Sequence, residues 1–254
     1  MCILFIALKM HPRYPLVLCA NRDEFHHRPT APAHFWPPEH RLLAGRDLQA
    51  GGTWLGVNRD GDIAALTNIR APAQQDGMRS RGELVTLALT QPSLMTDTWL
   101  LAHSQDYNPF NLVFGRNGQL QCFNSQSGQM QALSPGFHAI SNGALDDIWP
   151  KMAKGQQALE RLISSRDELN LDTMLALMQD ETRARDDELP STGIDLEWER
   201  RLSAIYIKHP DYGTRSTSLV LQDVQGRIDF TEVRYDGKGR KLGREHFQLA
   251  PPQP

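Results

Sequence analysis

Residues 1–25 read MCILFIALKMHPRYPLVLCANRDEF, and two apolar runs within them set up the start of the architecture. The runs at 2–8 and 16–19 are rich in residues that favour strands, and the two prolines between them suit a turn. The pattern therefore predicts two neighbouring antiparallel strands. Cys2 begins the first strand, and the polar residues NRDE at 21–24 end the second.

Hairpins and helices alternate in groups along the rest of the chain. Residues 53–68 and 110–123 each contain two short apolar runs around a glycine-bearing turn, which is typical of a β-hairpin. Apolar residues at helical spacing predict four helices, over residues 80–91, 96–102, 151–165 and 171–178, with Ser80 as the cap of the first. Further strands are predicted over residues 204–208, 217–222 and 227–233.

Two segments are expected to lack regular structure. Residues 28–40 are rich in proline, and residues 246–254 form a tail that should fray. Strands arrive as hairpins rather than in alternation with single helices, which argues against a parallel sheet. The chain therefore reads as one domain over residues 1–254, with an α+β fold in which two antiparallel sheets carry helices on their outer faces.

Composition argues against several classes of protein. The 254 residues are 40% hydrophobic and 22% charged with a net charge of −3, so no basic excess points to nucleic acid. No apolar run is long enough to span a membrane, and no basic segment precedes the first run as in a secretory signal. The three cysteines, Cys2, Cys19 and Cys122, lack metal-ligand spacing, which favours a cytoplasmic protein without a metal centre.

The cysteine behind the initiator methionine permits a specific chemistry. If Met1 is removed, Cys2 carries both a thiol and a free α-amine, and the amine can act as the base that activates the thiol. In unperturbed peptides the amine titrates near ~7.7–8.0 and the thiol near ~8.5, so a proton exchanges readily between them. Such a nucleophile would attack a carbonyl and form a thioester that water hydrolyses. The alternative is a small apolar residue packed in a strand.

A nucleophile of this kind needs donors for the oxyanion, a carboxylate that orients the amine and a cation for an anionic part of the substrate. Because neighbouring strands lie about 5 Å apart, the NRDE side chains at 21–24 can reach the end of the first strand, where Cys2 lies. The alternative is that this charged stretch is an ordinary solvated turn.

Several short motifs occur along the chain. They are MCI at 1–3, ANRDE at 20–24, GRD at 45–47, GGTWLGV at 51–57, AALTN at 64–68, RGELV at 81–85, SN at 141–142 and GTRS at 213–216. This set, from Cys2 to about Phe230, resembles the transport and Golgi organisation protein two family, which is also called the NRDE family. The resemblance implies an N-terminal-nucleophile hydrolase-like fold, a four-layer αββα sandwich, which agrees with the pattern above.

The layout is also similar to cysteine amidases of that fold, such as bile salt hydrolases, penicillin V acylases and acid ceramidase. The similarity implies a set of site residues: Cys2 as nucleophile, Asp23 as the carboxylate, Arg22 as its charged neighbour, Asn68 and Asn142 as oxyanion donors, and Arg215 as a late arginine. Those amidases space their arginine and aspartate three apart, whereas Arg22 and Asp23 are adjacent and should point to opposite faces of a strand. Either a bulge turns both inward, or Asn21 and Glu24 face the site instead.

Two hypotheses for function follow. The first is an amidohydrolase or thioesterase that acts from Cys2 on a small acylated compound and requires no cofactor. The second is a carrier that uses the same cleft, because the family has been linked to haem trafficking and to lipid or acyl-coenzyme A handling. Haem propionates and coenzyme A phosphates both favour guanidinium groups, which Arg22, Arg46 and Arg215 would supply, and the Cys2 thiolate could bind haem iron. Trp54 is expected to line the pocket or to belong to the core.

Overall fold

A computed structural model, which describes residues 2–38, 41–70, 74–165 and 169–251, places the strands in two antiparallel sheets. The first sheet contains, in spatial order, β10 (Gly136–Ile140), β1 (Cys2–Leu8), β2 (Leu16–Phe25), β11 (Tyr212–Gln222), β12 (Ile228–Tyr235) and β13 (Lys241–Leu249). The second sheet contains β3 (Thr30–Phe35), β4 (Leu42–Asp47), β5 (Leu55–Asn58), β6 (Asp62–Asn68), β7 (Phe110–Arg116), β8 (Gln119–Asn124) and β9 (Gln129–Ala132).

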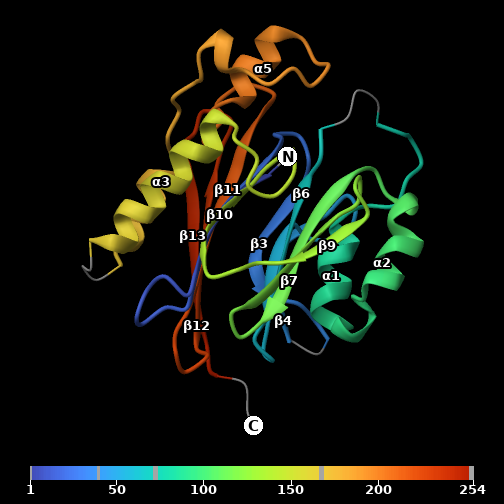
Figure 1. Cartoon of the computed structure of the whole chain (residues 1–254), viewed down its shortest axis with the longest axis vertical. Coiled ribbons are helices and arrows are strands. Elements are labelled where there is room, and N and C mark those ends of the chain that lie inside the picture. The colour runs from blue at the N-terminus through green and yellow to red at the C-terminus, as the bar shows by residue number, and fades with distance from the viewer. Residues whose placement is uncertain (1, 39–40, 71–73, 166–168, 252–254) are drawn as a thin grey trace.

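The predicted strand pair at the start of the chain is present, with β1 at its predicted bounds. β1 and β2 run antiparallel, and their register pairs Cys2 with Arg22 and Leu8 with Leu16. β2 is longer than predicted, because the NRDE residues continue the strand instead of ending it. The start of β1 and the polar end of β2 therefore lie side by side, at the end of the sheet where the amino terminus is marked (Figure 1).

One face of each sheet fills the space between the two sheets. Leu4 and Leu18 of the first sheet pack in the same apolar core as Leu43 and Leu55 of the second. Since side chains alternate along a strand, the even-numbered residues of β1 and β2 face this core and the odd-numbered residues face the opposite side. Cys2 is on the core-facing side, at the end of the space between the sheets.

Helices cover the outer faces and complete the four layers of an αββα sandwich (Figure 1). α3 (Pro150–Ser164) and α4 (Leu171–Met178) pack on the first sheet. α1 (Gly82–Thr90) and α2 (Asp97–His103) pack on the second. The remaining helical elements are α5 (Leu196–Leu202) and three short turns, η1 (Pro92–Leu94), η2 (Ser104–Asp106) and η3 (Asp186–Glu188). The predicted α+β fold and its four helices are confirmed, and within the described residues no helix is both long and apolar enough to cross a bilayer.

Both predicted hairpins are present as β5–β6 and β7–β8, but three other expectations are wrong. Residues 30–35 form β3 rather than an irregular loop, because an edge strand tolerates its proline; residues 39–40 lie outside the described part. Residues 204–208 do not join a sheet; residues 204–207 are buried and Lys208 is exposed. Residues 246–249 belong to β13, paired with β12, and are not frayed; residues 252–254 lie outside the described part.

The start of α1 also differs from the prediction. Arg81, not Ser80, is the residue that precedes the helix, and its side chain makes no capping hydrogen bond. The Ser80 carbonyl instead accepts a hydrogen bond from the Glu83 amide at 3.0 Å, as in a turn. Gly82 then packs against the backbone of Thr53, where a Cβ atom would come within 2.9 Å of the Thr53 carbonyl oxygen. This close approach fixes the start of α1 beside the second sheet.

Gly155 of α3 lets that helix approach β1, and Gly155→Ala is expected to destabilise the protein. Alanine favours a helix over glycine by about 1 kcal/mol, but its Cβ would lie only 2.0 Å from the buried Phe5 ring. Overpacking should outweigh the helix propensity and lower the free energy of unfolding by about 1–3 kcal/mol, measured by urea denaturation. Glu160→Ala, at an exposed position of the same helix, should change it by less than about 0.5 kcal/mol. A gain in stability for Gly155→Ala would show that the ring moves freely.

Candidate functional site

A cleft of about 310 Å³ opens beside Cys2, at the end of the space between the sheets. β1 and β2 supply Cys2 and the end of the NRDE stretch, and the second sheet supplies residues from β6 and from the segment before β5. Of the residues predicted for the site, those that line the cleft are Cys2, Arg22, Asp23, Glu24, Trp54 and Asn68. The fold therefore gathers six predicted residues from distant parts of the chain.

Cys2 is the least buried of the three cysteines. Cys2 is half-buried, whereas Cys19 and Cys122 are buried, and all three are free thiols. Burial raises the pKa of the Cys2 thiol above its usual range, and the nearby Arg22 guanidinium opposes that shift. The thiol is therefore protonated at neutral pH unless a base removes its proton.

Arg22 forms one wall of the cleft. It lies directly across from Cys2 in the strand register, and its guanidinium stacks 4.4 Å from the centre of the Trp54 ring. Asp47 and Glu24 are ion-pair partners at 3.8 and 4.0 Å, and the hydroxyl of Thr30 accepts a hydrogen bond at 3.2 Å. These contacts hold a side chain that is only 5% exposed.

Asp23 lies on the opposite face of β2 yet still borders the cleft, because the cleft lies at the end of the strand. Its carboxylate accepts a hydrogen bond from the Thr214 hydroxyl at 2.6 Å. Burial raises the pKa of Asp23, and the positive charges of Lys151 and Arg22 oppose the shift. A bulge is present, but it lies in β11 between Thr214 and Ser216 and not in β2.

Asn21 is not in the cleft, and its predicted contact with substrate does not fit its placement. Its amide nitrogen donates to the carbonyls of Met178 and Ile205 at 2.8 and 2.9 Å. Its amide oxygen accepts from the Thr217 hydroxyl at 2.6 Å, and the residue is 0% exposed. Alternation along β2 points Asn21 toward the α4 layer, so it connects layers of the fold. Of the two alternatives, Arg22 and Asp23 are therefore the pair at the cleft.

The two asparagines predicted as oxyanion donors differ in placement. Asn68 ends β6, is half-buried and lines the cleft, and no hydrogen bond of its side-chain amide is found within the described residues. Asn142 is buried, and its amide nitrogen donates to the Asn68 carbonyl at 2.9 Å. The Asn142 amide oxygen accepts from Ser141 at 3.2 Å and from Lys151 at 3.4 Å. Asn142 does not line the cleft, and it holds the backbone of Asn68 in position through this hydrogen bond.

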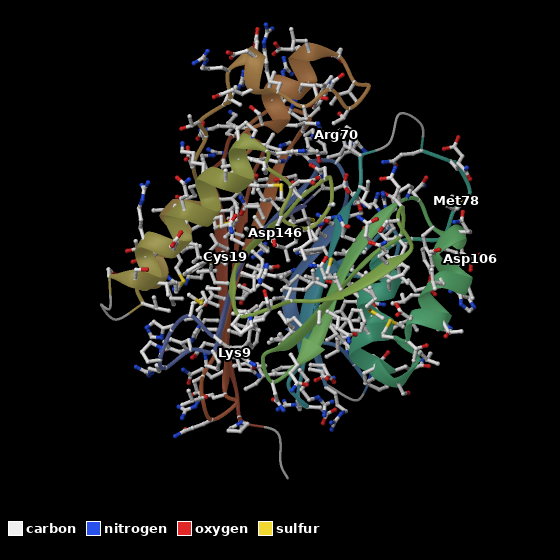
Figure 2. All side chains as sticks on the ribbon, viewed as in Figure 1. Lys9, Cys19, Arg70, Met78, Asp106 and Asp146 are labelled. Atoms are coloured by element: carbon white, nitrogen blue, oxygen red, sulfur yellow. The ribbon has the colours of Figure 1, made fainter. Side chains whose placement is uncertain are left out.

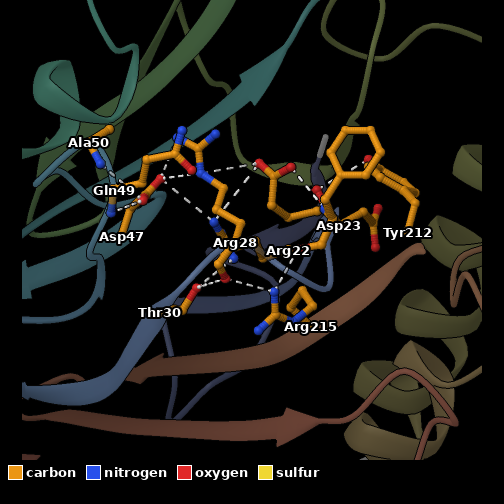
Figure 3. Close-up of polar contacts among 11 residues, drawn as sticks. Arg22, Asp23, Arg28, Thr30, Asp47, Gln49, Ala50, Tyr212 and Arg215 are labelled. Carbon is orange, nitrogen blue, oxygen red and sulfur yellow. Dashed lines mark hydrogen bonds and ion pairs between the residues drawn. The ribbon is translucent and has the colours of Figure 1, made fainter. Parts of the chain in front are cut away.

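Two predicted arginines lie outside the cleft. Arg46 is on the outer face of β4, where its guanidinium stacks 4.7 Å from the Trp36 ring centre and donates to the Gly51 carbonyl. Arg215, the bulged residue of β11, donates to the carbonyls of Phe25 and Arg28 at 2.7 and 3.0 Å (Figure 3). Neither guanidinium reaches the cleft. Arg215 instead holds the turn between β2 and β3.

Three arginines that were not assigned a role do line the cleft: Arg28, Arg79 and Arg81. Arg28 donates a hydrogen bond of 2.8 Å from Nε to the Asp47 carboxylate, and a second guanidinium nitrogen forms an ion pair with the same oxygen at 2.8 Å (Figure 3). Arg79 pairs with Glu83 and Asp106. Arg81 donates to the Pro109 carbonyl at 3.2 Å, and no carboxylate partner of Arg81 is found among the described residues. Arg81 is thus the cation best placed to meet an anionic ligand.

Lys151 is a buried lysine next to this site that sequence reasoning missed. It lies in the first turn of α3, and its Nζ donates to the Leu202 carbonyl at 3.0 Å. Burial and the nearby Arg70 lower the pKa of Lys151 to about 8, while Asp23 opposes the shift. The described residues contain no cluster of three or more histidines, cysteines or carboxylates that could hold a metal ion.

Alkylation by iodoacetamide tests the state of the Cys2 thiol. In a protein that carries additional residues before Met1, so that Cys2 has no free α-amine, Cys2 should react before the buried Cys19 and Cys122. Because burial raises the pKa of Cys2, its reaction rate should keep rising above pH ~8.5, as peptide mass spectrometry across pH 7–10 would record. A chain that begins at Cys2 carries an α-ammonium that shifts the profile to lower pH. A profile centred below pH 8 in the extended version contradicts the prediction; Met1 itself lies outside the described residues.

Similarity to known proteins extends over most of the chain. A family model described as Transport and Golgi organisation 2 matches residues 1–237. The chain is 35% identical over 256 residues to the Transport and Golgi organization protein 2 homolog of Bos taurus, covering 91% of this chain and 92% of that protein. The corresponding Homo sapiens homolog is 32% identical over 259 residues with the same coverage.

The architecture is also found among solved structures, and one example is similar over nearly the whole chain. It is the C2A mutant of conjugated bile acid hydrolase from Clostridium perfringens, with a TM-score of 0.52 and 8% sequence identity, covering 98% of this chain and 92% of that chain. At this identity the likeness shows a common fold. The predicted N-terminal-nucleophile hydrolase-like sandwich is thus confirmed.

Proposed function

The chain belongs to the Transport and Golgi organisation 2 family, and from that premise we propose that it hydrolyses an amide or thioester bond in a small acylated metabolite, with Cys2 as the nucleophile. One observation carries the proposal: the half-buried Cys2 lines a cleft that Asp23 and Asn68 also line. The shared fold adds support, because the solved relative of that fold is a hydrolase in which a cysteine at position 2 was replaced.

The reaction begins after removal of Met1. The α-amine of Cys2 takes the thiol proton, and the sulfur attacks the carbonyl carbon. Asn68 donates a hydrogen bond to the oxyanion, and Asp23 holds the ammonium form of the amine. As the C–N or C–S bond breaks, the ammonium gives its proton to the leaving group, which leaves a thioester on Cys2. Water then adds to the thioester, its proton returns to the sulfur through the amine, and a carboxylic acid is released.

The test follows the protein's mass and its product together. Intact mass spectrometry of the purified protein is expected to show a chain without Met1. Rapid quenching with a panel of acyl amides and acyl thioesters should then reveal an added acyl mass on the peptide that begins with Cys2, with release of the carboxylic acid. A protein that retains Met1, or that turns over substrate with no acyl group on Cys2, contradicts the proposal.

A second candidate is a carrier that binds in the same cleft without turnover. Two observations favour it. Burial raises the pKa of Cys2, which disfavours the attacking thiolate. The Asn142 amide donates to the Asn68 carbonyl and therefore does not point to an oxyanion. Its ligand would be a lipid, an acyl-coenzyme A or haem, with Arg81 facing an anionic group. For haem, the Cys2 thiol would lose its proton on binding the iron, so a raised pKa of the free thiol does not oppose this role. Haemin or acyl-coenzyme A binding without product release, unchanged in Cys2→Ser for the acyl ligand, would favour the carrier.

A further inference from the structure

A second cavity, of about 580 Å³, adjoins the cleft on the side of α5. Four residues line both spaces: Glu24, Arg28, Asn68 and Arg81. Most of the remaining wall is apolar and comes from Phe25, Ile194, Trp198, Leu202 and Tyr212. We call this second space the apolar chamber. Arg70, at its edge, lies below α5, whereas Met78, which borders the cleft, lies farther to the right, close to Asp106 (Figure 2).

The aromatic wall of the apolar chamber is held in place. The Tyr212 ring makes edge contacts with Phe25 and Trp198, at centroid distances of 5.2 and 6.0 Å. At the edge of the chamber, Arg70 forms an ion pair with Glu199 of α5, and their side chains are 6% and 5% exposed. The Tyr212 hydroxyl donates to the Asp23 carbonyl at 3.2 Å, which connects the chamber to the residue behind Cys2.

The wall of the apolar chamber leaves a large apolar side chain exposed. Phe25, at the end of β2, lines the apolar chamber and is 46% exposed. Large apolar side chains gathered around a concave space typically mark a ligand site. The cleft beside it has few apolar residues, and the charged residues that line the cleft alone are Arg22, Arg79, Asp23 and Asp47. Arg28, Arg81 and Glu24 line the boundary between the two spaces, and Arg70 and Asp195 are the charged residues of the chamber alone.

We infer that the two spaces divide one amphiphilic substrate. An apolar acyl chain lies in the apolar chamber, the scissile carbonyl lies at their shared boundary by Asn68, and the polar or anionic leaving part lies in the cleft against Arg81. The opposite orientation would place the apolar chain against the guanidinium groups of Arg22 and Arg79, which would lose hydration without gaining a partner, and would leave the apolar wall of the chamber without an apolar ligand. The reaction itself rests on the proposed function, but the binding does not.

Binding of linear carboxylates to the Cys2→Ser protein tests the inference without turnover. Hexanoate, octanoate and decanoate, titrated by calorimetry, should bind roughly fourfold more tightly for each added CH2. Adding Trp198→Ala should reduce this dependence to less than roughly twofold per CH2, because the chamber loses its largest apolar wall residue. Trp99→Ala is the matched control, since Trp99 stacks on His103 of α2 and lines neither space.

The outcomes separate the two proposals. Affinity that does not change with chain length, or that responds equally to Trp198→Ala and Trp99→Ala, would overturn the apolar chamber as the acyl site. Ile194→Trp, which fills the chamber from the other wall, gives a second test and should weaken decanoate more than hexanoate. Chain-length-dependent binding together with no hydrolysis by the wild-type protein would retain the chamber and remove the hydrolase.

Discussion

Replacing Cys2 by serine is expected to reduce turnover of a susceptible amide or thioester by at least roughly 1,000-fold while leaving the fold intact. The sulfur is the attacking atom of the proposed reaction, and a hydroxyl is a much weaker nucleophile at neutral pH. Because Cys2 is half-buried and serine has nearly the same shape, the free energy of unfolding should change by less than about 1 kcal/mol. Saturating turnover and urea unfolding of one preparation measure the two quantities.

Cys122→Ser is the matched control for this variant. Cys122 lies in the core between the sheets, so a hydroxyl there is buried without a partner and should cost about 1–3 kcal/mol of stability. Turnover per folded molecule should nevertheless persist, since Cys122 does not line the cleft. Cys2→Ser should therefore lose activity and keep its stability, whereas Cys122→Ser should lose stability and keep its activity. Turnover that survives in Cys2→Ser, or that is lost equally in both, removes Cys2 from the reaction.

Local patterns predicted most of the fold. β1 and the two hairpins follow from short apolar runs and glycine-bearing turns, which act over a few residues. The strands that were missed depend on distant partners. β3 carries Pro32 and is a strand because it pairs with β4 at the sheet edge. β13 is mostly polar and is ordered by its full-length pairing with β12.

The site could be predicted only where strand geometry specifies it. Cys2 and Arg22 meet because β1 and β2 are neighbours in sequence and in space. Arg46 and Asp47 are adjacent in β4, so one faces the cleft and one faces away, and the motif does not say which. Arg81 reaches the cleft through the packing of α1 on Thr53, whose amide donates to the Gly82 carbonyl at 3.2 Å. Nothing local in the sequence indicates that contact.

Asn68→Ala tests the next element of the site and should lower kcat by roughly 100- to 1,000-fold with little change in KM. In the proposed reaction the Asn68 amide donates to the oxyanion, a contact that forms only as the sulfur attacks. The residue ends β6 and its carbonyl is held by Asn142, so the backbone should keep its position when the side chain is shortened. Pre-steady-state acylation of Cys2 gives the rate of the affected step directly.

The control must lose a comparable side chain far from the cleft. Asn170→Ala removes the amide that caps α4, where Asn170 accepts from the Asp172 amide at 2.7 Å, and should cost about 1 kcal/mol of stability. Its kcat should equal that of the unmodified chain, because α4 lies on the outer face of the first sheet. If Asn68→Ala instead raises KM and keeps kcat, Asn68 holds the ground-state ligand at the boundary of the two spaces and the oxyanion is stabilised by another donor.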